Sequence, residues 1–189
     1  MGQSRIVVGI SGASGAIYGL RALQMLREAE VETHLVVSRS GELTLRSECG
    51  MGLRDLEVLC DVLHPVGNVG ATIASGSFRT MGMIVAPCSI RSLSEIVSGV
   101  TSTLLTRAAD VVLKERRPLV LMVRESPLHL GHLRSMTAAA EMGATIAPPM
   151  PAFYANPESI DELVSHSVGR VLDIFGIDSE IRRWPGLGR

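Results

Sequence analysis

The chain has 189 residues, a formal net charge of −1 at neutral pH and 46% apolar residues, of which few are aromatic. This length predicts one domain, residues 1–189, with an aliphatic, alanine-rich core. The nearly neutral charge gives no reason to expect a nucleic acid or an acidic surface as a partner. No apolar run in the sequence approaches the length of a membrane span, so no membrane partner is expected either.

The cysteines are Cys49, Cys60 and Cys88, an odd number without C-x-x-C spacing. This pattern favours neither a disulfide framework nor a zinc site. The first five residues lead directly into an apolar segment, so we expect no signal peptide. These features together predict a reduced, cytoplasmic protein.

The first predicted element is a buried strand over residues 6–10, which runs into the loop Ser-Gly-Ala-Ser-Gly at 11–15. Helical spacing begins at Ala16. Glycines allow a sharp turn and a close approach to a ligand, and the helix start behind them suits an anion. The hydroxyls of Ser11 and Ser14 are expected to face a phosphate. The spacing is not the G-x-G-x-x-G dinucleotide fingerprint, so a tight turn without a ligand is the alternative.

The rest of the chain alternates between helical and strand-like patterns of apolar residues. Helices are predicted over residues 16–29, 40–49, 53–59, 90–98, 104–114, 128–142 and about 157–175. Further strands are predicted over 31–37, 62–66 at an edge, 83–86 with Pro87 as its stop, 118–123 and 145–147. Residues 67–78 read as a flexible loop, and the tail from 176 has no clear element. This alternation predicts the α/β class, a Rossmann-like open parallel sheet with helices on both faces.

In such a sheet four strand ends lie along one edge: loop 11–15, Ser38, the segment 87–89 and Arg124-Glu125. The segment from Pro87 to Ser92 again places small hydroxyl residues at a helix start. Two such loops are able to hold a phosphorylated cofactor, although helix capping alone also explains the serines. Arg124 suits a phosphate and Glu125 suits proton transfer. A solvated ion pair is the alternative for these two residues.

Other reactive side chains carry weaker signals. Arg107 and Lys114 are two turns apart and share one helix face, but a charged helix end is usually solvated. Cys88 has no accompanying His-Asp pair and is expected to be a buried apolar residue. His129 and His132 have the i, i+3 spacing without an evident third ligand, so no metal site is predicted.

Four segments carry a resemblance to a known family: G-I-S-G-A-S-G-A-I-Y-G at 9–19, A-P-C-S at 86–89, L-T-R-A-A-D-V-V-L-K-E-R-R-P-L at 105–119 and P-A-F-Y at 151–154. The chain resembles the flavin prenyltransferases, the UbiX-type enzymes formerly called aromatic-acid decarboxylases. The resemblance extends from residue 6 to about residue 175. It implies a flavodoxin-like Rossmann fold and a homododecamer with active sites at subunit interfaces.

The resemblance also implies a reaction. Such enzymes transfer a dimethylallyl group from dimethylallyl monophosphate to reduced FMN, with new bonds at flavin N5 and C6, and need no metal. The product, prenylated FMN, is the cofactor of a separate UbiD-type decarboxylase in ubiquinone biosynthesis or aromatic-acid decarboxylation. No acidic residue stands at the end of the second predicted strand to take an adenosine ribose, which agrees with FMN rather than a nicotinamide dinucleotide.

The resemblance assigns roles to individual residues of this chain. The FMN-binding set is Gly12, Ala13, Ser14, Ser38, Ser89, Ile90, Arg91, Ser92 and Arg124. The prenyl phosphate set is Tyr154 and Arg170, joined by Arg107 and Lys114 of a neighbouring subunit. The catalytic set is Glu125, as general acid, with Glu48, Ser14 and Lys114.

Two local departures and two alternative functions stand beside this interpretation. The segment after Glu48 is unusually rich in glycine, and residues 67–74 are compact. One alternative is a cysteine-decarboxylating flavoprotein, but the early catalytic histidine is missing, and Pro151 follows Met150 where that family has asparagine. The other is a flavin-binding carrier or accessory subunit of a decarboxylase, without chemistry of its own.

Overall fold

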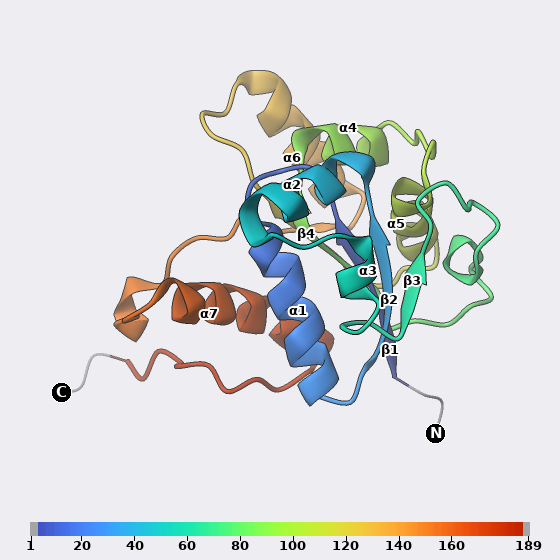
Figure 1. Cartoon of the computed structure of the whole chain (residues 1–189). Coiled ribbons are helices and arrows are strands. Elements are labelled where there is room, and N and C mark those ends of the chain that lie inside the picture. The colour runs from blue at the N-terminus through green and yellow to red at the C-terminus, as the bar shows by residue number, and fades with distance from the viewer. Residues whose placement is uncertain (1–3, 187–189) are drawn as a thin grey trace.

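The computed structural model describes residues 4–186 and contains a six-stranded parallel sheet with the strand order β3-β2-β1-β4-β5-β6 (Figure 1). The predicted domain, residues 1–189, also includes 1–3 and 187–189, which lie outside the described residues. The strands are β1 (Arg5–Ile10), β2 (Glu32–Val37), β3 (Val62–His64), β4 (Met83–Cys88), β5 (Leu119–Val123) and β6 (Thr145–Ile146).

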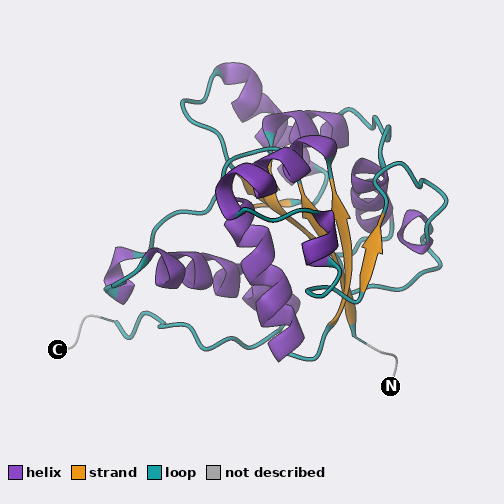
Figure 2. Ribbon diagram, in the orientation of Figure 1, coloured by secondary structure: helices purple, strands orange, loops and turns teal. Residues whose placement is uncertain are grey.

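Helices cover both faces of this sheet (Figure 2). One face packs against α1 (Ala16–Glu28), α2 (Arg39–Cys49), α3 (Leu53–Leu56) and α7 (Ile160–Leu172). The other packs against α4 (Ile90–Val97), α5 (Leu104–Lys114) and α6 (Leu130–Glu141). Three 3₁₀ turns complete the elements: η1 (Thr72–Ala74), η2 (Phe153–Ala155) and η3 (Asp173–Phe175). The predicted Rossmann-like class is confirmed.

The core consists of two aliphatic layers, because successive residues of a strand point to opposite faces of the sheet. In β1, for example, Ile6 and Val8 are buried on the side of α1, whereas Val7 is buried on the side of α5. A sheet buried on both faces explains why its strands read as continuous apolar runs in the sequence.

The strand β4 differs from the prediction at Pro87. The strand was expected to stop before this proline, yet it continues to Cys88. The register with β5 shifts between Val85 and Cys88, so the missing N–H of Pro87 falls at an irregular part of the ladder. The Pro87 carbonyl oxygen accepts a hydrogen bond from the main-chain N–H of Ser11 at 3.2 Å.

The loop predicted over residues 67–78 contains the turn η1 and is attached to α5. The Arg107 side chain donates to the carbonyl oxygen of Ala74 at 3.2 Å. Both terminal nitrogens of Arg117 donate to main-chain carbonyls, those of Phe78 at 2.8 Å and Gly76 at 2.7 Å. The loop is therefore held in place by cations of α5 and of the residues that follow it.

The strand order places a topological switch point between β1 and β4, because the chain moves outward from β1 to β3 and then returns to the other side of β1. The loops after β1 and β4 are consequently neighbours at the carboxyl ends of the strands. Open α/β sheets bind their ligands in this crevice. In the described part of the chain, no helix has both the length and the apolar character needed to cross a membrane.

Candidate active site

The loops after β1 and β4 are joined by Ser11. Its buried hydroxyl donates to the Pro87 carbonyl oxygen at 2.9 Å and accepts from the Ser89 N–H at 2.7 Å. The sequence-based expectation that this hydroxyl faces a phosphate is therefore wrong, because both of its hydrogen bonds go to the neighbouring loop. Ser11 instead holds the two walls of the site together.

A cavity of about 550 Å³ opens at this switch point. Its lining includes seven residues of the predicted site: Gly12, Ser38, Ser89, Ile90, Arg91, Ser92 and Glu125. The structure thus brings together residues from four separate strand ends, as the parallel sheet predicted. Ala13, Ser14 and Arg124 do not line it.

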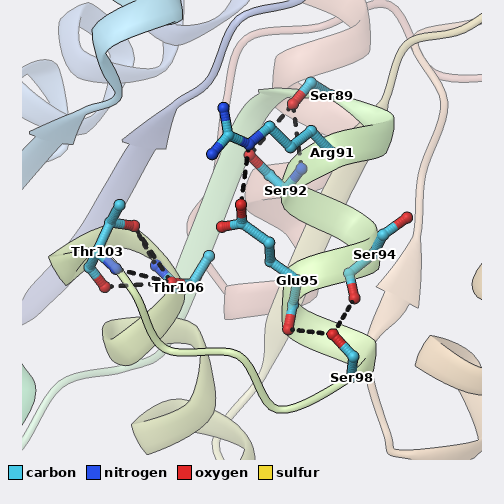
Figure 3. Close-up of polar contacts among 8 residues, drawn as sticks. All are labelled: Ser89, Arg91, Ser92, Ser94, Glu95, Ser98, Thr103 and Thr106. Carbon is cyan, nitrogen blue, oxygen red and sulfur yellow. Dashed lines mark hydrogen bonds and ion pairs between the residues drawn. The ribbon is translucent and has the colours of Figure 1, made fainter.

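One wall of the cavity is the first turn of α4 (Figure 3). The Ser89 hydroxyl caps this helix by accepting from the Ser92 N–H at 3.2 Å, and it also donates to the Ser92 hydroxyl at 3.1 Å. Arg91 extends outward and pairs with Glu95 at 2.9 Å. Across from α4, Thr103 caps the start of α5. This wall presents hydroxyl groups and a helix N-terminus to the cavity, an arrangement that suits an anion.

The start of α2 forms a second wall. The Ser38 hydroxyl accepts from the Gly41 N–H at 3.0 Å, and Arg39 follows it on the cavity surface. Gly12 packs directly against this turn, since a Cβ atom at Gly12 would lie 2.2 Å from the Cβ of Ser40. The glycine therefore allows the β1 loop to approach α2, and it also lines the cavity.

The start of α1 carries an anion supplied by the protein. The Glu48 carboxylate accepts from the N–H groups of Gly15 at 2.8 Å and Ala16 at 3.1 Å. Partial burial raises the pKa of Glu48, but hydrogen bonds from Ser14 and these two N–H groups, with the charge of Arg124, outweigh it and leave the pKa lowered. Glu48 is therefore ionised at neutral pH. A phosphate at this helix start, as the sequence predicted, would lie next to the negatively charged Glu48 carboxylate.

Arg124 and Glu125 directly follow β5, but only Glu125 lines the cavity. The Glu125 carboxylate accepts from the Ser126 N–H at 3.0 Å. The charge of Arg124 lowers the pKa of Glu48 and opposes the larger effect of burial on Tyr18, so its guanidinium lies near both of those side chains. The predicted acid thus lines the cavity, whereas the predicted phosphate ligand does not.

Arg107 and Lys114 share one face of α5, as their spacing predicted, but neither lines the cavity. Arg107 pairs with Asp110 at 2.6 Å and donates to the loop at Ala74. Lys114 is exposed and pairs with Glu115 at 2.6 Å. Their face of α5 covers the loop 67–78, so their expected use by a neighbouring subunit stays a prediction.

Tyr154 and Arg170 lie at α7, away from the cavity. Figure 1 shows α7 beside α1, on the side of the molecule opposite α5 and β3. The Tyr154 hydroxyl lies 3.1 Å from Nε2 of His166, and Arg170 pairs with Asp173 at 2.5 Å. Within one chain, these two residues are not brought to the cavity.

Several cavity residues escaped the sequence analysis. Arg39 directly follows Ser38 at the end of β2, one of the strand ends that were predicted to lie along the ligand-binding edge of the sheet. Thr103 and Thr106 form a reciprocal cap at the start of α5, and this pattern was readable as T-x-x-T before an apolar helix. Val66 and Gly67 complete the wall from the loop after β3, which no motif marked.

Two weaker candidates have structural explanations. Cys88 is fully buried, and burial raises the pKa of its thiol to about 12, so it is the inert apolar residue that was predicted. His129 caps α6, where its Nδ1 accepts from the Gly131 N–H at 3.0 Å. Within residues 4–186, no three His, Cys, Asp or Glu side chains gather into a group suited to a metal ion.

Comparison with known proteins identifies the family. The flavoprotein family model matches residues 1–172. The flavin prenyltransferase UbiX of Escherichia coli (strain K12) is 58% identical over 188 residues, which cover 97% of this chain and 100% of that protein.

Two solved structures agree with this result. The crystal structure of AnUbiX (PadA1) in complex with FMN and dimethylallyl pyrophosphate has a TM-score of 0.96 and 46% identity, with 99% of this chain and 100% of that chain covered. A dodecameric FMN-dependent UbiX-like decarboxylase from Escherichia coli O157:H7 has a TM-score of 0.93 and 50% identity, with 96% and 100% covered. The chain therefore belongs to the flavoprotein family and, within it, to the UbiX-type flavin prenyltransferases.

Proposed function

We propose that the chain binds reduced FMN in the 550 Å³ cavity at the switch point and joins a dimethylallyl group to it. The observation that carries the proposal is the convergence of two capped helix starts, α2 and α4, on a cavity lined by serine hydroxyls. Such donors fit a monophosphate group, and the family relationship supports FMN as the molecule that carries this phosphate.

The residues of the two helix starts would hold the FMN phosphate. Ser38, Ser89 and Ser92 offer hydroxyls, and Arg39 and Arg91 add positive charge at the rim. The start of α1 is unsuited to this phosphate, since its N–H groups already bind the Glu48 carboxylate. This placement moves the phosphate from the first loop, where the sequence suggested it, to α2 and α4. Gly12, Ala13, Ser14, Ile90 and Arg124 stay candidate contacts of the flavin.

The proposed reaction breaks the carbon–oxygen bond of dimethylallyl monophosphate, and the electron pair leaves with the phosphate. Reduced FMN, when bound, would supply the electron-rich ring. The bond to N5 replaces the broken carbon–oxygen bond with loss of the N5 proton, and the bond to C6 is balanced by protonation of the dimethylallyl double bond and loss of the C6 proton. Glu125 delivers a proton to the leaving phosphate oxygen, and Arg170, Tyr154, Arg107 and Lys114 neutralise or bind that phosphate. Glu48, ionised beside Ser14 at the start of α1, stays a candidate catalytic residue.

The active site is proposed to be shared between subunits of a homododecamer. In one chain Tyr154 and Arg170 lie at α7, while Arg107 and Lys114 lie on the outer face of α5, so a single copy does not gather the phosphate set. The dodecameric relative supports this assembly. Three free cysteines support a reducing, cytoplasmic location. The prenylated FMN would serve a separate UbiD-type decarboxylase.

Anaerobic incubation with reduced FMN and dimethylallyl monophosphate tests the proposal, with dimethylallyl pyrophosphate in parallel to identify the donor. We expect the mass of the extracted flavin to increase by one dimethylallyl unit. FMN that binds but keeps its mass with both donors would indicate the carrier function. Tight binding of NAD without affinity for FMN would contradict both functions.

A further inference from the structure

Tyr154 is held by a buried histidine that the reaction does not otherwise use. His166, on α7, is only 7% exposed, whereas Tyr154 is 42% exposed. The Tyr154 hydroxyl oxygen lies 3.1 Å from His166 Nε2, and the two rings are nearly perpendicular, with centroids 5.5 Å apart. One side of the tyrosine is therefore fixed by the protein, and the rest remains accessible.

A second contact of the same nitrogen determines where the protons are. The main-chain carbonyl oxygen of Arg182, in the C-terminal tail, also lies 3.1 Å from His166 Nε2. A carbonyl oxygen only accepts hydrogen bonds, so Nε2 must carry the hydrogen. The other tautomer would set the nitrogen lone pair against the carbonyl oxygen. The imidazole N–H is thus shared between Arg182 and the oxygen of Tyr154.

This arrangement directs the hydroxyl proton of Tyr154. Because His166 donates to its oxygen, the O–H bond of the tyrosine must point away from the imidazole. Trp184 packs edge-on against the same ring, with centroids 5.4 Å apart, so the tail supports the tyrosine from a second direction. The tail also brings Arg183 to Asp173, the residue that pairs with Arg170. Tyr154 and Arg170, two of the residues assigned to the prenyl phosphate, are thereby tied to one segment, 182–184.

We propose that His166 is a positioning residue: it fixes the Tyr154 ring and leaves the phenolic proton free for an anionic oxygen of the prenyl phosphate. His166 itself does not touch the substrate. The proposal rests on the proposed function, because Tyr154 meets a phosphate only if the chain uses a prenyl phosphate.

Variants at position 166 separate this role from a purely structural one. His166→Leu removes the donor, whereas His166→Gln keeps an N–H group at a similar distance from the main chain. We expect His166→Leu to lower kcat/KM for dimethylallyl monophosphate by about 10-fold or more, mainly through KM, and His166→Gln to restore most of it. FMN affinity should stay at the parent value. Ser167→Ala, on the next position of α7, is the matched control and should behave as the parent.

A double variant gives the decisive comparison. If His166 acts through the Tyr154 hydroxyl, adding His166→Leu to Tyr154→Phe should cause no further loss. Losses that multiply in the double variant, or parent kcat/KM in His166→Leu, would overturn the proposal. If the parent protein makes prenylated FMN, these outcomes test only the role of His166 and not the proposed function. A parent that makes none would show that the proposed function itself is wrong.

A measurement without substrate or flavin tests the tautomer directly. In protein labelled with ¹⁵N at histidine, the His166 resonances should show a protonated Nε2 and an unprotonated Nδ1, with assignment from the His166→Gln variant. The opposite tautomer would contradict the inference, because Tyr154 would then have to donate its proton to the imidazole.

Discussion

Ser11 has a structural role in the candidate site. It joins the loops after β1 and β4 through two hydrogen bonds in a fully buried position. Ser11→Ala leaves the Pro87 carbonyl and the Ser89 N–H each without that partner. We expect the free energy of unfolding to fall by ~1–3 kcal/mol in urea titrations.

The matched control for this change is Ser94→Ala, at an exposed position of α4. It should leave the free energy of unfolding within about 0.5 kcal/mol of the parent value. Equal stability of the Ser11 and Ser94 variants would show that the buried hydroxyl does not hold the loops together.

Glu125 carries the most specific catalytic assignment. Its carboxyl group lines the cavity, and Glu125→Gln keeps the size and most hydrogen bonding while it removes the transferable proton. We expect FMN affinity to survive and prenyl transfer to fall by roughly 10²-fold. Arg124→Ala should instead weaken FMN binding. Stopped-flow measurement of flavin prenylation checks the first effect, and turnover at the parent rate would refute the acid role.

At the scale of elements, the edge formed by β2 and β3 contains a buried chain of titratable groups. His34 Nδ1 lies 2.9 Å from His64 Nε2, and His34 Nε2 lies 2.9 Å from Glu32, which also pairs with Arg5. Burial lowers the pKa of His64, and the neighbouring His34 acts in the same direction. The folded protein therefore resists protonation of His64.

The direction of the pH effect follows from this lowered pKa. The unfolded chain binds a proton at His64 below about pH 6.5, while the folded chain does so only at lower pH. Stability from the neutral imidazole is complete above that pH and is lost as the pH falls toward the folded pKa. Lowering the pH from about 7.5 to 5.5 should reduce the free energy of unfolding of the parent more than that of His64→Gln, as measured by urea titration at each pH. Identical pH dependence would exclude His64 as the cause.

Most of the fold was predictable because its signals are local. Apolar runs marked the strands, and the parallel order followed from the alternation with helices. Pro87 misled the prediction, because a register shift in the ladder tolerates a residue without an N–H. Ser11 was misjudged for another reason: its partner, Pro87, is distant in sequence, and only the folded chain brings the two together. The contact of Gly12 with Ser40 was likewise not predictable from local sequence.

The sequence predicted which residues form the candidate site better than it predicted how they contact one another. The strand ends showed that Ser38, Ser89 and Glu125 would share one edge. The hydrogen bonds from the start of α1 to Glu48 could not be predicted from the sequence, because they depend on how α2 packs against α1. The contact between His166 and Tyr154 likewise depends on how the turn η2 folds back onto α7, and the tail adds the Arg182 carbonyl to it.

At the scale of the whole molecule, the proposed site requires more than one copy of the chain. Figure 1 shows α7, which Tyr154 contacts through His166, and α5, which ends at Lys114, on opposite sides of the molecule. Subunits with Lys114→Ala and subunits with Ser14→Ala each lack one part of the site. Co-expression with two affinity tags yields mixed particles, in which some complete sites should restore prenyl transfer. Mixed particles as inactive as either variant, or a fully active monomer, would contradict shared sites.

The central claim is that this chain itself forms the bonds between the dimethylallyl group and FMN. The most direct measurement uses ¹³C-labelled dimethylallyl monophosphate with reduced FMN under anaerobic conditions, followed by NMR of the extracted flavin. The account predicts label bonded at flavin N5 and C6, in a product absent without the protein. Unlabelled FMN recovered after binding, or label released only as free dimethylallyl alcohol, would contradict it.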